Sequence, residues 1–299
     1  MEHSDEADHQ MSEIVILDGA MGTELTRRGV DTSLPLWSAI ALDAAPEVVA
    51  QIHRDYLEAG ARVITTNTFR TNVRALAKAG IAHRARELTF RAVGLARRAI
   101  AQWQRGQGQS APIRVAGSIA PVEDCYSPEL VPSDAELAEE HALLARYLAE
   151  AGVDLILVET QNTIREAIAA ARAAHATGKP VWVSFTLDGE NRLLSGEALD
   201  DAVRAVLPFV PQAVLVNCIP VKQVASAVRI LRSAAPPHVA VGAYGNVGHV
   251  DETLGWTLTN AVAPDAYARA AHEWRSLGAA IIGGCCGTTP DHIRAIAAL

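Results

Sequence analysis

The chain has few cysteines and few aromatic residues, and it contains neither a basic block nor a long apolar run. Four cysteines among 299 residues do not make the disulfide framework of a small secreted domain. A net charge of −8 without a cluster of lysines and arginines argues against nucleic acid or an anionic membrane as a partner. No apolar stretch approaches the roughly 20 residues of a membrane-spanning helix. We therefore expect neither nucleic acid nor a membrane among its partners.

The first twelve residues are acidic and contain two histidines, but they lack the apolar core of a signal peptide. We predict a disordered segment over residues 1–12 and a folded domain over residues 13–299. We also predict a cytoplasmic location. In that reducing compartment, clustered cysteines indicate metal binding or catalysis more than disulfides.

Short apolar runs rich in β-branched residues alternate with longer alanine-rich stretches along the rest of the chain. Near-continuous apolar strands are typical of a parallel sheet that is buried on both faces. Ser133, with Glu136 three residues later, predicts a helix that begins at Asp134. The predicted strands are Ile14–Leu17, Arg62–Thr66, Ile113–Gly117, Leu155–Glu159, Val181–Thr186, Val214–Asn217, Val239–Ala243 and Ala280–Ile282. The predicted helices are Pro46–Ala59, Ala82–Trp103, Asp134–Ala151, Thr163–Ala176, Asp200–Val206, Val221–Ala234, Pro264–Leu277 and Pro290–Ala298.

Eight strands, each followed by a helix, predict a single α/β domain with the fold of a (β/α)8 TIM barrel. A hydrophobic content of 49% is enough for its core. The alternative is an open, doubly wound sheet, which would favour a glycine-rich phosphate turn after the first strand. The stretch Asp18–Gly22 does not fit that motif, and the chain has no Walker sequence.

The most informative motif is the pair Cys285 and Cys286, which is framed by glycines at the end of the last predicted strand. Neighbouring side chains of a regular strand point to opposite faces, so two adjacent thiols converge only where the backbone breaks that alternation. Glycines allow such a break. In a barrel, Cys218 at the end of the sixth strand reaches the same rim, where barrel enzymes place their sites. We therefore predict a site that contains three thiols.

Three protein ligands with an open fourth position are typical of a catalytic zinc site, and thiolates select zinc over magnesium or calcium. We predict Zn²⁺ on Cys218, Cys285 and Cys286, with the open position available to a substrate thiolate. A zinc hydrolase would favour histidine or carboxylate ligands. A non-enzymatic zinc or redox sensor that uses Cys285 and Cys286 remains an alternative.

Other polar and aromatic residues stand near the carboxyl ends of the predicted strands, where a substrate would bind. Glu159 is an acidic residue at the end of an otherwise apolar strand, which predicts that it points into the site. Trp37, Phe69 and Tyr126 are candidate walls for a cationic ligand, through attraction to ring faces. The predicted substrate contacts among these residues are Asp18, Trp37, Thr66, Phe69, Glu159 and Asn217.

The motifs at these strand ends resemble those of the homocysteine S-methyltransferase family, and the resemblance runs from about residue 14 to residue 299. It is carried by five segments: Leu17–Thr23, Ile64–Phe69, Val158–Thr160, Val216–Cys218 and Gly283–Pro290. The resemblance implies a (β/α)8 barrel that transfers a methyl group to homocysteine and gives methionine. It also implies zinc on the three cysteines, with the homocysteine thiolate as a further ligand.

The resemblance further implies roles for individual residues. Asp18 and Glu159 would meet the homocysteine ammonium, and backbone amides around Ala20 and Met21 would take its carboxylate. Asn246 falls in the motif after the seventh strand, where the family's asparagine oxygen can be a fourth zinc ligand before homocysteine arrives.

The chain departs from the family pattern on the side of the methyl donor. The stretch Ser118–Tyr126 differs from the glycine- and tyrosine-rich sequence that usually follows the third strand, and Gly245 replaces a usual proline. We expect a sulfonium donor, S-methylmethionine or S-adenosylmethionine, with betaine or a partner corrinoid protein as alternatives. The sequence leaves open the donor, a different thiol or selenol as acceptor, the oligomeric state and the role of Cys125.

Overall fold

The structure is a computed structural model that describes residues 14–105, 112–251, 255–257 and 262–299. Its main sheet has eight parallel strands in the order β1-β10-β7-β6-β5-β4-β3-β2. A parallel bridge between Leu17 and Val63 joins the two ends of this order and closes the barrel. The strands are β1 Val15–Ile16, β2 Val63–Thr65, β3 Arg114–Ile119, β4 Leu155–Gln161, β5 Val181–Phe185, β6 Ala213–Pro220, β7 Ala240–Asn246 and β10 Ala279–Gly284.

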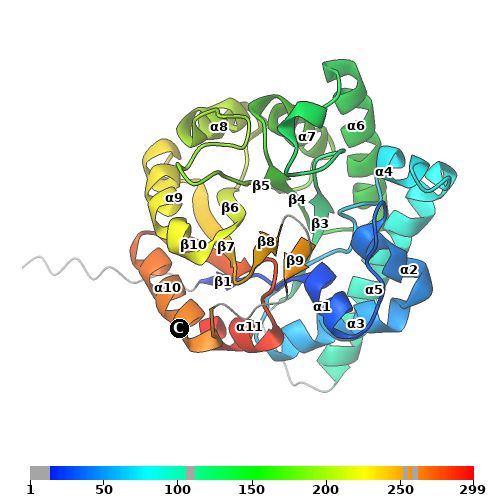
Figure 1. Ribbon diagram of the computed structural model, residues 1–299, viewed down its shortest axis with the longest axis horizontal. Helices are drawn as coiled ribbons and strands as arrows, with labels where there is room; N and C mark the ends of the chain where they lie inside the picture. The colour runs from blue at the N-terminus through cyan, green and yellow to red at the C-terminus, as the bar shows by residue number, and fades with distance from the viewer. Residues whose placement is uncertain (1–13, 106–111, 252–254, 258–261) are drawn as a thin grey trace, which may run out of the picture.

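Helices surround the strands, which lie at the centre of the molecule (Figure 1). Each predicted strand and helix overlaps an observed one, and the predicted (β/α)8 barrel is confirmed, while closure rules out the open sheet. The helices are α1 Met21–Arg27, α2 Ala41–Ala44, α3 Pro46–Glu58, α4 Val73–Ala77, α5 Ala85–Arg105, α6 Asp134–Ala151, α7 Ile164–Ala176, α8 Leu199–Val206, α9 Val221–Ala234, α10 Pro264–Ser276 and α11 Pro290–Ala297.

Length explains which helices could be predicted. The Ser133 side chain and Glu136 form the expected capping box at the start of the 18-residue α6. The helices that the sequence did not predict are the short ones, α1, α2 and α4, with 7, 4 and 5 residues. An antiparallel hairpin of β8 (His249–Asp251) and β9 (Gly255–Thr257) was not predicted either.

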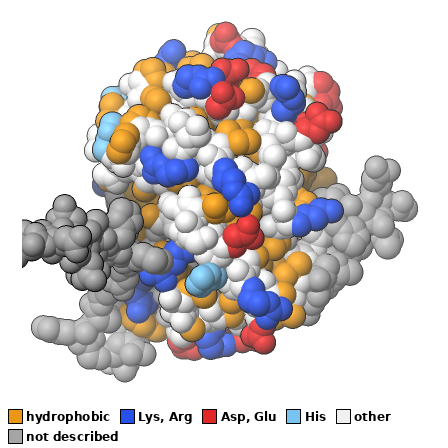
Figure 2. Space-filling view, turned by 90° about the vertical axis from the view of Figure 1, so that its left-hand side faces the viewer, with side chains coloured by type: hydrophobic (Ala, Val, Ile, Leu, Met, Phe, Trp, Pro, Cys, Tyr) orange, Lys and Arg blue, Asp and Glu red, His pale blue; other side chains and the backbone are white. Residues whose placement is uncertain are grey.

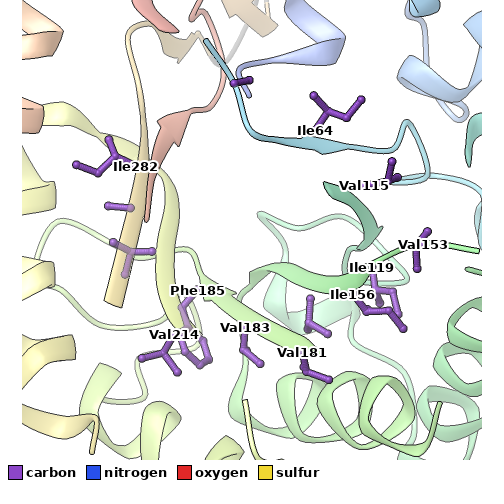
Figure 3. Packing of buried hydrophobic residues seen from close by; sticks show 14 of the residues in the cluster. Ile64, Val115, Ile119, Val153, Ile156, Val181, Val183, Phe185, Val214 and Ile282 are labelled. Atoms are coloured by element: carbon purple, nitrogen blue, oxygen red, sulfur yellow. The ribbon is translucent and has the colours of Figure 1, made fainter. Parts of the chain in front are cut away.

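The barrel strands alternate between two packing layers, as extended chains do. On β4, Leu155 and Leu157 lie in the barrel interior, whereas Ile156 and Val158 pack outward toward the helices. The outward layer is the larger core, and Figure 3 shows part of it, including Ile156. A fully buried aliphatic side chain of this kind contributes roughly 1.5–3 kcal/mol to folding. The same alternation turns Glu159, the next odd position on β4, toward the interior.

The outer faces of the helices carry both signs of charge. Figure 2 shows lysine, arginine, aspartate and glutamate side chains interspersed with single hydrophobic ones over one face. Many of these charges pair locally, as Arg204 of α8 does with Asp200 and Asp201. Among the described residues, no helix combines the length and apolar character needed to cross a membrane. The predicted disordered segment over residues 1–12 lies outside the described residues, so the predicted domain boundary stays a prediction.

Candidate active site

A polar layer covers the carboxyl end of the barrel interior. On β2 to β6, the last apolar interior position is followed, two residues later, by a polar one, because the strands continue to alternate. On β2, for example, Val63 in the interior is followed by Thr65. The polar positions of this layer are Thr65, Ser118, Glu159, Ser184, Asn217 and Tyr244.

Cys218 follows this layer on β6, where the strand loses its regular register. The pairing of β6 with β7 shifts between Asn217 and Pro220, and Cys218 has a φ of 56°. A residue other than glycine rarely adopts this left-handed conformation, which costs of order 1–3 kcal/mol and persists where the surroundings enforce it. The break changes the direction of the Cys218 side chain relative to a regular strand.

The Asn217 side chain stabilises an irregular backbone on the neighbouring part of the rim, at Thr160 of β4. Its Oδ1 accepts hydrogen bonds from the Thr160 amide at 3.0 Å and from the Ser184 hydroxyl at 2.7 Å. Its Nδ2 donates to the Thr160 hydroxyl at 2.8 Å. Thr160 also has a positive φ, of 58°. Asn217 is fully buried and is not among the residues that line the cavity.

The other two thiols lie just beyond β10, which ends at Gly284. The Cys285 amide donates to the Gly245 carbonyl at 2.9 Å, and the Val247 amide donates to the Cys286 carbonyl at 3.1 Å. These bonds fasten the turn to the end of β7. The predicted break in strand alternation at the cysteine pair is therefore present.

The three sulfur atoms come together at the rim. Cys218 Sγ lies 3.2 Å from Cys285 Sγ and 3.6 Å from Cys286 Sγ, and all three lie within 4.8 Å of one another. Tetrahedral ligands at about 2.3 Å from zinc would be about 3.8 Å apart. Within the part of the chain that the structure describes, these three cysteines form the one cluster of histidine, cysteine or acidic side chains that could hold a metal ion.

The three thiols influence one another's protonation. Hydrogen bonds from Cys285 and Cys286 hold the pKa of Cys218 well below its usual range. Hydrogen bonding to Cys218 in turn raises the pKa of Cys285 and Cys286. Three thiolates at this spacing repel one another, so they ionise together only when a cation compensates their charge. Near them, the buried Oδ1 of Asn246 has no hydrogen-bond partner, and the Asn246 side chain hydrogen-bonds to Cys218.

Two buried carboxylates lie below the thiols. Asp18 accepts hydrogen bonds from the Thr65 amide at 2.7 Å and the Thr65 hydroxyl at 2.9 Å. Glu159 accepts hydrogen bonds from the hydroxyls of Ser118 and Tyr244. Burial raises the pKa of Asp18 to about 8, against these hydrogen bonds, and raises the pKa of Glu159 to about 7. A ligand ammonium between them would favour their charged forms.

The N-terminal motif and the cysteine turn are linked by hydrogen bonds. The Thr288 hydroxyl accepts from the Ala20 amide at 3.2 Å and donates to the Cys285 carbonyl at 2.7 Å. The Thr23 hydroxyl accepts from the Gly287 amide at 3.1 Å. Because α1 begins at Met21, the first amides of the helix have no intrahelical acceptor.

A cavity of about 490 Å³ joins these groups. The rings of Trp37 and Phe69 meet edge to face on its wall, with centroids 5.4 Å apart, and the Tyr126 hydroxyl lies 3.1 Å from Cys218 Sγ. The sequence-predicted residues that line the cavity are Asp18, Ala20, Met21, Trp37, Thr66, Phe69, Glu159, Cys218, Cys285 and Cys286. Asn217 and Asn246 lie outside this lining, and the roles of all twelve residues stay predictions.

Sequence reasoning missed the residues that hold the two carboxylates and one charged residue of the cavity wall. Thr65, Ser118 and Tyr244 could have been found by extending the two-residue alternation of each predicted strand to its end. Arg70 also lines the cavity, and its position directly after Phe69 was the available signal.

A closed parallel barrel that brings three thiols and two carboxylates to its carboxyl rim defines this chain as a barrel enzyme with a thiol-lined site. The chain belongs to the homocysteine S-methyltransferase family, whose model matches residues 15–299. A homocysteine S-methyltransferase of Escherichia coli (strain K12) is 31% identical over 301 residues, which cover 96% of this chain and 95% of that protein. A selenocysteine methyltransferase of Astragalus bisulcatus is 27% identical over 96% of this chain and 93% of that protein.

A solved structure of a homocysteine methyltransferase is also similar to this chain in fold. The metallated form of the homocysteine methyltransferase MmuM from Escherichia coli superposes with a TM-score of 0.84, at 30% identity, over 96% of each chain. Its apo form gives a TM-score of 0.74. These relatives make the chain a methyltransferase by family.

Proposed function

We propose that this protein transfers a methyl group from a sulfonium donor, S-methylmethionine or S-adenosylmethionine, to the sulfur of homocysteine and so forms methionine. The observation that carries the proposal is the convergence of three cysteine sulfurs on a cavity that also holds two buried carboxyl groups. Cys218 Sγ lies 3.2 Å from Cys285 Sγ and 3.6 Å from Cys286 Sγ. The family match supports the acceptor. The cytoplasmic location stays a prediction, and the oligomeric state stays open.

Cys218, Cys285 and Cys286 fit Zn²⁺, because soft thiolates and a tetrahedral spacing are what this ion prefers. When bound there, zinc would lower the pKa of the homocysteine thiol, so that the acceptor sulfur is a thiolate at neutral pH. The orphaned Oδ1 of Asn246 makes that residue the candidate for a further ligand in the absence of homocysteine.

The amino acid end of homocysteine would bind at the two carboxylates. An ammonium group between Asp18 and Glu159 would favour the charged forms of these two carboxyl groups, whose pKa values burial raises. Backbone amides around Ala20 and Met21, at the start of α1, would receive the carboxylate. Binding at both ends fixes the direction of the acceptor sulfur, and orientation of this kind contributes much of the rate in a transfer between two bound molecules.

The donor would enter along the aromatic wall. Trp37, Phe69 and Tyr126 border the same cavity as the thiols, and their ring faces attract a sulfonium cation. The thiolate sulfur attacks the methyl carbon, the bond from that carbon to the sulfonium sulfur breaks, and the donor leaves as a neutral thioether. Charge is neutralised in this step, so a water-poor cavity favours it.

The proposal is tested by replacing one thiol. We expect Cys286→Ala to lose zinc and to reduce homocysteine methylation by at least 100-fold, because the site then has two thiolates. Zinc content and methionine formation are measured on the same preparation. Cys125→Ser is the matched control: Cys125 is a buried thiol outside the three-sulfur group, and its variant should keep the metal. Full zinc occupancy and activity in Cys286→Ala would refute the proposal.

The donor and the acceptor are tested separately. S-methylmethionine, S-adenosylmethionine, betaine and methylcobalamin are offered to the zinc-loaded protein with homocysteine, and we expect turnover with a sulfonium compound. Selenocysteine is the second acceptor to try, because a relative bears the name selenocysteine methyltransferase. No turnover together with a reversible disulfide between Cys285 and Cys286 would favour a redox sensor instead.

A further inference from the structure

Arg70 is a half-buried guanidinium on the wall of the cavity. Its Nε is buried and has no hydrogen-bond partner. Its Nη1 makes a long hydrogen bond of 3.4 Å to the Glu123 carbonyl. Arg70 takes part in no ion pair with any residue that the structure describes. A guanidinium has five N–H donors and always carries a charge, so most of its binding capacity is unused.

The next basic residues along the chain are arranged differently. Arg74 pairs with Glu123 at 3.3 Å and with Glu136 at 2.6 Å, and Lys78 also pairs with Glu123. Glu123 and Glu136 are therefore paired with Arg74 and Lys78. Asp124, which also lines the cavity, accepts hydrogen bonds from the Tyr126 amide and the Ser127 hydroxyl. Arg70, four residues before Arg74, is directed into the cavity, where an anion would find an unpaired cation.

The surroundings of Arg70 place that anion on the donor side. Glu123 lies in the loop after β3, which ends at Ile119. Tyr126 lies in the same loop, and its hydroxyl contacts Cys218 Sγ at 3.1 Å. Phe69, next to Arg70 in sequence, meets Trp37 edge to face. The guanidinium thus shares one wall with the rings, whereas Asp18 and Glu159 lie in the floor formed by the strand ends.

We propose that Arg70 is a specificity-determining residue that binds the carboxylate of a zwitterionic methyl donor, while the rings of Trp37, Phe69 and Tyr126 receive its sulfonium end. This inference rests on the proposed methyl transfer. A planar guanidinium binds a carboxylate through two parallel N–H···O bonds, and the buried Nε would gain an acceptor. Donors that carry a carboxylate would be favoured over otherwise equal donors without one.

The sharpest probe is a pair of compounds that differ by the carboxylate alone: S-methylmethionine and its decarboxylated analogue, (3-aminopropyl)dimethylsulfonium. Binding of each to the zinc-loaded protein is measured by calorimetry without homocysteine, so that no turnover is needed. We expect the wild type to bind S-methylmethionine roughly 10- to 100-fold more tightly than the analogue, as for a charge-assisted bond. Arg70→Gln should remove this difference.

Two further variants separate recognition from folding. Arg70→Lys keeps the positive charge but cannot donate two parallel hydrogen bonds to a carboxylate, so it should retain part of the preference for S-methylmethionine over the analogue. Arg204→Gln makes the same chemical change as Arg70→Gln on an exposed residue of α8, and it should bind both compounds as the wild type does. If Arg70→Gln fails to fold, Arg70→Lys and the comparison of the two compounds on the wild type still decide the matter.

The outcomes distinguish this inference from the proposed reaction. Equal affinity of the wild type for the two compounds, or an equal loss for both in Arg70→Gln, would overturn the role of Arg70 even if homocysteine is methylated. A rise in the KM for homocysteine instead of the donor in Arg70→Gln would overturn it too. Tight, carboxylate-dependent binding without any methylation would uphold Arg70 and refute the reaction.

Discussion

At the scale of single residues, the site depends on groups held in states that they would not adopt alone. Cys218 and Thr160 have left-handed backbones, and hydrogen bonds of the Asn217 side chain tie Thr160 to β5 and β6. Asp18 and Glu159 are carboxyl groups whose pKa values are raised by burial. Such strain and desolvation concentrate at functional sites, where a ligand relieves them.

The pKa of Asp18 makes a prediction about stability. In the folded protein it is about 8, whereas in the unfolded chain it is about 3.9. Between these values the folded state binds more protons than the unfolded state, so the free energy of unfolding falls as the pH rises from about 4 to about 8. In Asp18→Asn this contribution is absent. We expect the wild type to lose at least ~1.4 kcal/mol more than the variant between pH 5 and pH 8.

Denaturant unfolding of the metal-free proteins measures this difference. The cysteines titrate in both proteins, so their contributions cancel in the comparison. The difference between the proteins includes the electrostatic coupling of Asp18 to Glu159, which the variant lacks. Asp201→Asn, at an exposed carboxylate of α8, should follow the wild type at both pH values. Parallel pH profiles for the wild type and Asp18→Asn would show that Asp18 is not a buried, protonated carboxyl group.

At the scale of elements, the carboxyl end of β10 sets the position of the cysteine pair. A Cβ added to Gly284 would lie 2.4 Å from Thr288 Oγ1, and that hydroxyl holds the Ala20 amide and the Cys285 carbonyl together. Glycine is needed here because the backbone of β10 and the turn after it approach each other closely. The glycine frame of the cysteine pair therefore has a packing reason as well as a conformational one.

We expect Gly284→Ala to destabilise the protein by about 1–3 kcal/mol, as overpacking of a core does, and to reduce zinc binding because Cys285 shifts. Gly94→Ala is the matched control: Gly94 lies within α5 and an added Cβ meets no atom within 4 Å. That change should stabilise the helix by roughly 0.5–1 kcal/mol. Denaturant unfolding and zinc content are the measurements, and a Gly284→Ala protein as stable as Gly94→Ala would contradict the packing argument.

At the scale of the whole molecule, the sequence predicted the barrel and the convergence of Cys218, Cys285 and Cys286, because regular alternation of strands and helices fixes which ends share a rim. It could not predict that Asn217 would brace Thr160, since that contact depends on the left-handed backbone of Thr160, which no sequence pattern indicates. It also missed α1, which is only 7 residues long. The position of Arg70 after Phe69 indicates that it lies near the site, but only the fold shows that Arg74 and Lys78 pair with Glu123 and Glu136 while Arg70 lines the cavity.

The central claim is that the three cysteines hold zinc and leave one position for the acceptor thiol. X-ray absorption at the zinc edge of the loaded protein, with and without homocysteine, tests it most directly. We predict three sulfur ligands at about 2.3 Å in the protein alone, and four after homocysteine is added. A sulfur count that stays unchanged with homocysteine, or a shell of nitrogen and oxygen ligands only, would contradict the account.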